Sequence, residues 1–270
     1  PADMPATLVA YIEAEKRHAG EPHEEAAGLA EPLLEAILNE VGDRVGHDFS
    51  GYKSSTLIRR LRHRMSIHGL EDPGAYLDLL RRTPAEADLL FREAIISVTN
   101  FFRDPEAWES LAEGPLREQL EAAADAGQDF RAWVVGCATG EEAYSLAMLV
   151  SECLEAIDRK PPVQIFATDV DAQALETART GRYPAGIAED LTVERLARHF
   201  VAEEDAFLVT KPIRDMVVFA EHNVLQDPPF SHMNVITCRN LLIYLERDLQ
   251  QRLLPVFRYA LRPEGLLFLG

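Results

Sequence analysis

The residues best placed to do chemistry surround a glycine turn in the middle of the chain. The segment from Ala132 to Met148 reads AWVVGCATGEEAYSLAM, which predicts a buried strand, a tight loop and a helix that begins at Glu141. Gly136 and Gly140 allow positive φ angles and a close approach of a ligand to the backbone. The unpaired N–H groups of the first helical turn lie beside that loop. We therefore expect a small polar ligand to bind there.

Two adjacent carboxylates, Glu141 and Glu142, stand at the start of this predicted helix. A phosphate-binding loop would not carry carboxylates at this position, because their negative charge would repel the phosphate from the helix N-terminus. The carboxylates favour a ligand that is cationic or rich in hydroxyl groups. The dinucleotide fingerprint Gly-x-Gly-x-x-Gly is also absent, since Ala138 occupies its middle position. Nucleoside triphosphates and NAD therefore fit the sequence poorly.

An acidic residue closes the next predicted strand. The apolar run from Val163 to Ala167 leads into Thr168 and Asp169. A doubly wound fold places a carboxylate that binds ribose hydroxyls at this strand end, about 20 to 30 residues beyond the glycine turn. An Asp after a strand can also be an ordinary turn residue. Together with the glycine turn, Asp169 favours a ligand that carries ribose.

Composition limits the classes of function. The chain has 270 residues, of which 47% are hydrophobic, so it can form two domains or one large domain. Its net charge of −18 disfavours nucleic acid as a partner. Neither Cys-x-x-Cys nor His-Glu-x-x-His occurs, so we expect no metal. No apolar run approaches the roughly 20 residues needed to cross a bilayer, and we expect a cytoplasmic protein without membrane insertion.

Hydrophobic periodicity predicts three parts: a helix and acidic linker over residues 1–30, an all-helical domain over 31–120 and an α/β domain over 121–270. In the helical domain we expect helices over 31–41, 54–65, 72–82 and 84–96. In the α/β domain we expect strands over 132–135, 163–167, 233–238 and 266–269. Two further strands, over 207–210 and 215–220, are expected to form a small antiparallel excursion. The last helix contains Pro255, which should kink it.

One predicted helix is strongly basic. Between Lys53 and Arg64 the chain carries positive residues and no acid, although the whole chain is acidic. Arg59, Arg60 and Arg62 on this helix are candidates for docking an acidic partner, which long-range attraction would recruit. The alternative is a solvated helix face without a partner.

An aromatic pair, Phe101 and Phe102, precedes Arg103-Asp104-Pro105. The spacing predicts a helix that Asp104 caps and Pro105 begins. The pair suits a segment that folds over a pocket, but adjacent aromatic residues are more often part of a hydrophobic core.

Five segments in a fixed order resemble one known family: VTNFFRDP, GCATGEEAYSLAM, ATDVD, HNVL and CRNLLIY. Over residues 31–270 the chain resembles the CheR-type chemotaxis receptor methyltransferases, which transfer a methyl group from S-adenosylmethionine to glutamate side chains of chemoreceptors. The resemblance implies an α/β fold: a Rossmann-like class I methyltransferase domain with a small antiparallel β insertion, preceded by a small all-α domain.

The resemblance also implies roles for individual residues. Cofactor contacts would come from Thr99, Arg103, Gly136, Glu141, Asp169, Asn223, Val224, Arg239 and Asn240, and catalytic roles would fall to Tyr244 and Arg103. Glu141 is preferred over Glu142 because it is nearer the loop, but the choice between them stays open. The implied partners are the cytoplasmic helices of chemoreceptors and a fused or associated methylesterase or other signalling domain.

Two departures from the family pattern support rival interpretations. Ser97 stands where many members have Asn, and the chain lacks the family's closing hairpin after the last strand. A domain that binds S-adenosylmethionine or S-adenosylhomocysteine as a sensor or scaffold, without catalysis, is therefore an alternative. A nucleic-acid amino-methyltransferase is a weaker rival. Its Asp-Pro-Pro-Phe motif, here residues 227–230, should follow the fourth strand, but in this sequence it precedes that strand.

Overall fold

The computed structural model describes residues 31–95 and 99–270. Its internal contacts divide the described chain into two units: residues 31–95 with Tyr244–Asp248, and residues 99–243 with Leu249–Gly270. The predicted helix and linker over residues 1–30 and the departure at Ser97 lie outside the described residues. We treat each unit by itself.

The first unit is helical, as the periodicity predicts. It contains α2 (Glu31–Val45), α3 (Ser54–Ile67), α4 (Pro73–Arg82) and α5 (Pro84–Ala94). The inner stripe of α2 consists of Leu34, Ile37 and Val41, which are buried at helical spacing. Asp72 caps α4 by accepting the N–H groups of Gly74 and Ala75, each at 3.1 Å. These local signals are strong, which explains why the helices could be predicted.

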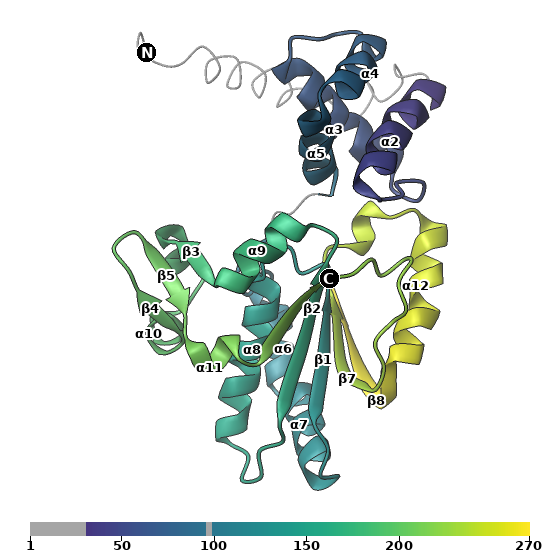
Figure 1. The fold of residues 1–270 in the computed structure, drawn as a ribbon. Coiled ribbons are helices and arrows are strands. Elements are labelled where there is room, and N and C mark those ends of the chain that lie inside the picture. The colour runs from purple at the N-terminus through teal and green to yellow at the C-terminus, as the bar shows by residue number, and fades with distance from the viewer. Residues whose placement is uncertain (1–30, 96–98) are drawn as a thin grey trace. The chain divides into compact units, whose positions relative to one another are not determined.

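The second unit is built on a parallel sheet (Figure 1). Its main strands are β1 (Phe130–Val135), β2 (Val163–Asp169), β6 (Val217–Glu221), β7 (Met233–Cys238) and β8 (Leu261–Leu269). Its main helices are α6 (Pro105–Ala112), α7 (Pro115–Asp125), α8 (Glu141–Glu155), α9 (Ala172–Thr180) and α12 (Arg247–Ala260), which contains Pro255. The strand order is β6-β2-β1-β7-β8, and every pairing is parallel.

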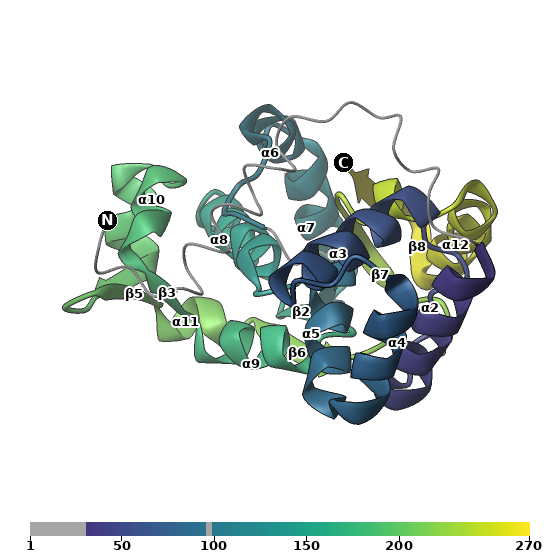
Figure 2. The same ribbon diagram turned by 90° about the horizontal axis from the view of Figure 1, so that it is seen from above.

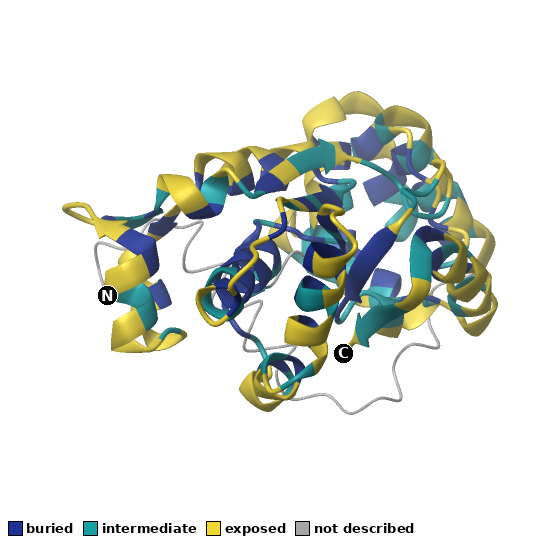
Figure 3. Cartoon of the chain, turned by 90° about the horizontal axis from the view of Figure 1, so that it is seen from below, coloured by how far each residue is buried: buried dark blue, intermediate teal, exposed yellow. Residues whose placement is uncertain are grey.

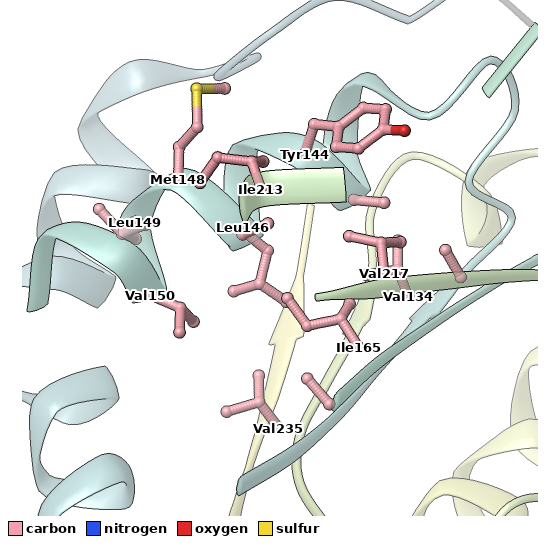
Figure 4. Packing of buried hydrophobic residues seen from close by; sticks show 14 of the residues in the cluster. Val134, Tyr144, Leu146, Met148, Leu149, Val150, Ile165, Ile213, Val217 and Val235 are labelled. Atoms are coloured by element: carbon pink, nitrogen blue, oxygen red, sulfur yellow. The ribbon is translucent and has the colours of Figure 1, made fainter. Parts of the chain in front are cut away.

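Helices cover both faces of this sheet (Figure 2). On β1 the side chains of Ala132 and Val134 join a core cluster with Leu146 of α8 (Figure 4). Trp133, between them in the sequence, points to the opposite face, where its ring lies 6.3 Å from that of Phe257 on α12. Because both faces are covered, β1 is apolar and buried from Ala132 to Val135, and its neighbour β7 is buried along its whole length (Figure 3).

A smaller antiparallel sheet is inserted between α9 and β6. It contains β3 (Arg182–Pro184), β4 (Phe200–Ala202) and β5 (Ala206–Val209), in the order β3-β5-β4, with η2 (Ala185–Glu189), α10 (Val193–His199) and α11 (Lys211–Arg214) around it. The predicted excursion is thus present, but its membership differs. The predicted strand over 215–220 is β6, which pairs parallel to β2 in the main sheet. As a half-buried edge strand, β6 shows the alternation that an antiparallel strand also shows.

The helices α6 and α7 belong to the second unit. Trp108 of α6 and Leu116 and Leu120 of α7 share a core cluster with Phe130 and Val134 of β1. The predicted boundary at residue 120/121 therefore differs from the division by contacts, which falls before Thr99. A helix packed on a sheet and a helix packed on helices have the same amphipathic pattern, so the pattern alone does not assign them to a domain.

Within the described residues, no helix combines the length and the apolar character needed to span a membrane.

Candidate active site

The sheet reverses its winding between β1 and β7. The chain leaves β1 through α8 to reach β2, and it leaves β7 through α12 to reach β8, with α8 and α12 on opposite faces. Open parallel sheets bind ligands beyond the carboxyl ends of the strands at such a switch point. Asp169 is the last residue of β2, and the loops after β1, β6 and β7 carry Gly136, Asn223 and Arg239, respectively. The topology thus brings these predicted site residues to one edge of the sheet.

The glycine turn after β1 has the predicted shape. The backbone N–H of Gly136 donates to the carbonyl of Thr168 at 2.8 Å, which holds the loop against the end of β2. The φ angles are 71° at Gly136, 46° at Ala138 and 96° at Gly140. A Cβ on Gly140 would lie 2.8 Å from the Cβ of Ala178, so only glycine allows α9 to pack this closely.

Asp169 lies at the carboxyl end of β2, beside this turn. Its carboxylate accepts the N–H of Ala138 at 2.8 Å and the N–H of Asp171 at 2.9 Å. Burial raises the pKa of Asp169, although these backbone hydrogen bonds oppose the rise. Among the described residues Asp169 forms no ion pair. Each of its oxygens retains acceptor capacity, which a ligand hydroxyl can use.

Glu141 and Glu142 have different surroundings. Glu141 accepts a hydrogen bond from Thr139 Oγ1 at 2.6 Å. Glu142 accepts one from Thr237 Oγ1 at 2.5 Å, at the carboxyl end of β7. The contact with β7 places Glu142 at the switch point between β1 and β7.

Burial raises the pKa of both carboxyl groups to about 7. For Glu142 the Thr237 hydrogen bond and the charges of Arg239 and Arg103 oppose this rise. For Glu141 the Thr139 hydrogen bond opposes it, and the charge of Asp190 adds to it. Glu142, the second choice from the sequence, is thus the glutamate whose pKa is lowered by the charges of two predicted site residues, Arg103 and Arg239.

The aromatic pair before Arg103 is part of the core. Phe101 and Phe102 are only 1% and 4% exposed. The ring of Phe101 packs edge-on against Tyr183 at 5.0 Å and Phe200 at 5.4 Å, both from the antiparallel sheet. The rings therefore do not form a cover over a pocket. They attach the segment that carries Thr99 and Arg103 to the body of the unit.

Asp104 occupies the N-cap position of α6, but its side chain does not cap the helix. Its φ angle is 56°, and its carboxylate pairs with Nη2 of Arg239 at 2.7 Å. The predicted capping role is therefore wrong. The buried guanidinium of Arg239 takes the carboxylate as its counter-ion instead.

Arg239 follows β7 directly. Its guanidinium lies over the ring of Phe268 at 4.7 Å and near that of Trp108 at 5.6 Å. Nη2 also donates to the carbonyl of Arg103 at 3.0 Å. Asn240, the next residue, has a positive φ of 55°. Arg239 therefore lies at the carboxyl edge of the sheet, where it was predicted to line the floor of the cofactor site. It also contacts the segment that carries Arg103.

Asn223 and Val224 follow β6, the strand next to β2. The backbone N–H of His222 donates to the carbonyl of Asp169 at 3.0 Å, which keeps this loop beside Asp169. The side-chain oxygen of Asn223 accepts the N–H of Leu225 at 3.0 Å. The predicted adenine-flanking residues thus lie next to the predicted ribose-binding carboxylate.

The Asp-Pro-Pro-Phe segment at residues 227–230 lies between β6 and β7. Phe230 stacks on Phe166 of β2 with ring centroids 4.9 Å apart and an interplanar angle of 24°. The aromatic residue that should grip a target base is packed against the sheet. This geometry argues against the amino-methyltransferase interpretation.

Two groups of predicted residues lie in the helical unit. Tyr244 belongs there by its contacts, since its carbonyl accepts the N–H of Lys53 at 2.9 Å. On α3, Arg59 is exposed and Arg60 and Arg62 are partly exposed, and within the described part of the chain none of the three forms an ion pair. Arg64 differs, because it donates to both oxygens of Glu86, at 2.9 and 2.6 Å.

Two polar residues at the site were missed from the sequence. Thr237 positions Glu142, and Ser145 accepts the N–H of Phe102 at 2.9 Å. Both are fully buried, Ser145 between Tyr144 and Leu146 and Thr237 between Ile236 and Cys238. A hydroxyl group within such a short apolar stretch is the signal that could have identified them, because a buried hydroxyl needs a partner.

The described residues 31–95 and 99–270 contain no group of three His, Cys, Asp or Glu side chains placed to hold a metal ion. Cys137 and Cys238 are free and buried, and burial raises the pKa of both thiols. Neither residue supplies a thiolate at neutral pH.

Comparison with known families decides the assignment. The family model described as CheR methyltransferase, SAM binding domain, matches residues 97–270, and the one described as CheR methyltransferase, all-alpha domain, matches residues 32–94. The chain belongs to the CheR methyltransferase family. The resemblance drawn from the five sequence segments is thereby confirmed, as is the fold: a class I methyltransferase domain with an antiparallel insertion and an all-α domain before it.

Several curated proteins of this CheR family are similar in sequence. A 104.1 kDa uncharacterized protein of Rhodobacter capsulatus is 44% identical over 223 residues, which cover 83% of this chain and 23% of that protein. A chemotaxis protein methyltransferase of Escherichia coli is 30% identical, over 91% of this chain and 85% of its own length. WspC of Pseudomonas aeruginosa, named a probable biofilm formation methyltransferase, is 31% identical, over 84% and 53%. The chain thus spans about a quarter of the first relative and most of the second.

Solved structures of other methyltransferases are distant neighbours of this CheR-family chain. The glycopeptide N-methyltransferase MtfA complexed with S-adenosyl-L-methionine is 12% identical, with a TM-score of 0.34 over 56% of this chain and 48% of that one. A methyltransferase of Methanosarcina mazei is 14% identical, with a TM-score of 0.33 over 52% and 51%.

Proposed function

We propose that this chain binds S-adenosylmethionine at the carboxyl ends of β1, β2 and β7 and transfers its methyl group to glutamate carboxylates of chemoreceptor-type signalling proteins. The observation that carries the proposal is the pair of partly buried carboxylates, Asp169 and Glu142, at the switch point of the sheet, each held by hydrogen bonds from the neighbouring strand ends or loops. The names of relatives such as the Escherichia coli chemotaxis protein methyltransferase support the reaction class.

The residues present fit this cofactor. When bound, S-adenosylmethionine supplies a methyl group activated by a sulfonium, and it also carries an ammonium group and ribose hydroxyls. Asp169, which two backbone N–H groups orient, accepts hydrogen bonds from the hydroxyls. Glu142, which Thr237 orients, is the counter-charge for the ammonium group in our proposal, in preference to Glu141. A ligand that carries ammonium and sulfonium groups suits a site whose carboxyl groups have raised pKa values, because its positive charges stabilise their ionised forms.

The acceptor chemistry needs little acid or base. A glutamate side chain with an ordinary pKa of about 4.3 is already a carboxylate at neutral pH. The task of the protein is to align the acceptor oxygen with the methyl group, to exclude water and to hold the acceptor's charge. We assign the last role to Arg103. We assign to Tyr244 the positioning of the acceptor.

The acceptor protein must also associate with the enzyme. The methylated helices of chemoreceptors are acidic in our proposal, and Arg59, Arg60 and Arg62 of α3 offer cations that no acid within the described residues neutralises. Attraction between these charges would raise the association rate and would weaken with salt. We place this encounter in the cytoplasm.

The first test is titration calorimetry with S-adenosylmethionine and S-adenosylhomocysteine. We expect Asp169→Asn to weaken binding of both by about 10- to 100-fold, because a hydrogen bond to a charged group contributes about 1.5–3 kcal/mol. Asp205→Asn, which removes an exposed carboxylate paired with Arg182, is the matched control and should bind normally. A wild-type chain that folds but binds neither compound would refute the proposal.

The second test follows methyl transfer from labelled S-adenosylmethionine to a chemoreceptor cytoplasmic fragment. A glutamyl methyl ester releases methanol in alkali, which distinguishes it from N-methyl products. Receptor fragments with Gln in place of the acceptor Glu serve as the control. Tight cofactor binding without transfer to any acidic acceptor would instead favour the non-catalytic sensor or scaffold.

A further inference from the structure

Arg103 sits in a turn with an unusual backbone. We call residues 102–104 the Arg103 turn. Phe102 and Asp104, on either side of Arg103, have φ angles of 47° and 56°. Residues other than glycine avoid this region, and a strained conformation persists only where the surrounding structure enforces it. Contacts on both sides of the Arg103 turn enforce this conformation.

One side of the Arg103 turn is fixed to α8. The N–H of Phe102 donates to Ser145 Oγ at 2.9 Å, and Ser145 Oγ donates to the carbonyl of Glu141 at 2.7 Å. The ring of Phe102 is covered by the guanidinium of Arg195, which lies 3.9 Å from the ring centroid. These contacts connect the turn to the helix that begins with the site carboxylates.

The other side is fixed to β7 and α6. The carbonyl of Arg103 accepts two hydrogen bonds, from Trp108 Nε1 and from Arg239 Nη2, both at 3.0 Å. The same Nη2 donates to the carboxylate of Asp104 at 2.7 Å. The side chain of Arg239 is 3% exposed and held between Trp108 and Phe268. A buried guanidinium therefore holds the carbonyl of Arg103 and the side chain of Asp104, the next residue.

Together these contacts fix the backbone from which the Arg103 side chain extends. The main chain of Arg103 is held through its carbonyl and through both neighbours. Its charge lies close enough to Glu142 to lower the pKa of that carboxyl group. A turn that served only to join the preceding segment to α6 would not require a buried arginine and strain at two residues.

We infer that Asp104, Arg239 and Ser145 are positioning residues, which hold the Arg103 turn so that the Arg103 side chain is presented to Glu142 at the switch point. This inference rests on the proposed function and deepens it. None of the three needs to touch the acceptor or the reacting atoms. They act through Arg103.

The test is a set of double-variant cycles read out by calorimetry with S-adenosylmethionine. Asp104→Asn and Ser145→Ala are made in the wild type and in the Arg103→Ala background. Asn tolerates a positive φ, so Asp104→Asn removes the charged contact without adding strain. Arg239 is not varied, because it also lies at the predicted floor of the site.

We expect each variant to weaken binding about five- to tenfold in the wild type and less than twofold in the Arg103→Ala background, because residues that act as a unit are non-additive. Equal losses in both backgrounds would overturn the inference, since that result means that the contacts stabilise the fold and not Arg103. Asp205→Asn, whose carboxylate pairs with Arg182 in the antiparallel sheet, should change neither value.

A second measurement does not depend on cofactor. Hydrogen exchange of the peptide covering residues 99–105 should become faster in Asp104→Asn, while peptides of α8 beyond Ser145 keep their protection. Unchanged exchange over 99–105 would overturn the inference even in a chain that binds no S-adenosylmethionine. Failure of cofactor binding in a wild type with the expected exchange change would refute the proposed function alone.

Discussion

Glu141 is buried and Glu142 and Asp169 are partly buried at one end of the sheet, and the pKa of each is raised. Holding carboxylates away from water in this way costs stability in the free protein, because the ionised forms lose hydration. A cationic ligand recovers that cost on binding. These carboxyl groups thus lower the stability of the free protein but favour binding of the ligand, as is common at functional sites.

The two adjacent glutamates offer a matched pair of variants. We expect Glu142→Gln to weaken S-adenosylmethionine binding about tenfold or more, because it removes the counter-charge at the switch point. Glu141→Gln, which changes the neighbour bonded to Thr139, should weaken it by less than threefold. Calorimetry on both variants measures the difference. The reverse order of effects would return the role to Glu141.

Cofactor affinity should depend on pH through the same group. Burial raises the pKa of Glu142 to about 7, so in the free protein the carboxyl group is increasingly protonated as pH falls below 7. The ligand ammonium group stays charged throughout this range. Affinity should therefore fall about tenfold from pH 7 to pH 5.5, with proton release on binding that calorimetry in two buffers detects. A Glu142→Gln variant that keeps the full pH dependence would contradict this assignment.

Asp169 and the glycine turn could be proposed from the sequence because both depend on local order along the chain. The preference for Glu142 over Glu141 that we propose could not. Neighbouring residues at a helix start point about 100° apart, and which one meets the site depends on the helix orientation. The deciding partner, Thr237, lies in β7, far along the chain. Contacts between distant segments carry no local signal.

At the level of elements, α8 and α10 are joined by a partly buried ion network. Arg195 of α10 donates through Nε and Nη2 to both oxygens of Glu152 on α8, each at 2.9 Å. His199 Nε2 lies 3.5 Å from the same carboxylate. The network attaches the antiparallel insertion to the main sheet layer, next to the Phe102 ring that Arg195 also covers.

This network should make stability depend on pH. Although burial opposes it, the nearby ring of His199 and the hydrogen bonds from Arg195 hold the pKa of Glu152 at about 2. Because the folded pKa is lowered, the stabilisation is present above the unfolded value of about 4.5 and is lost as pH falls toward 2. We expect Glu152→Gln to lower the free energy of unfolding by about 2 kcal/mol at pH 7 and by much less at pH 2.5.

Denaturant unfolding of wild type and Glu152→Gln at the two pH values checks this expectation. Glu155→Gln is a suitable control, because Glu155 pairs with Arg198 on the same two helices but its side chain is 57% exposed. A Glu152→Gln deficit that is the same at pH 2.5 and pH 7 would show that the network contributes packing and not charge.

Most elements could be predicted because their signals are local. Asp72 and Pro73 marked the start of α4, and the apolar run Met233–Cys238 marked β7. The assignment of β6 to the antiparallel excursion failed because a half-buried edge strand looks alike in both kinds of sheet. The domain to which α6 and α7 belong depends on what covers their apolar faces, and the periodicity does not contain that information.

At the level of the whole molecule, a chain of net charge −18 carries a helix whose exposed cations are unpaired within the described residues. We expect the triple variant Arg59→Glu, Arg60→Glu and Arg62→Glu to slow methylation of an acidic receptor fragment about tenfold or more at low salt. The effect should shrink as salt screens the attraction. Affinity for S-adenosylmethionine should stay unchanged.

The control for this variant must change net charge equally. Reversing Arg247, Arg252 and Arg258, exposed residues of α12, does so. Initial rates at several salt concentrations, with calorimetry for the cofactor, separate the two triples. Equal loss of methylation in both would mean that net charge acts and that α3 has no special role. Loss of cofactor affinity in the α3 variant would contradict separate docking and binding surfaces.

The position of β1 in the middle of the sheet has a consequence for how the chain folds. β1 pairs with β2 soon after it in the sequence, but its other neighbour is β7, with Ala132 opposite Val235. Pairings between such distant segments are slow to form, because a long loop must close first. During synthesis the side of β1 that pairs with β7 therefore remains an unpaired apolar edge until β7 has left the ribosome. A nascent chain shorter than Cys238 exposes that edge, and it is there that we expect aggregation to begin.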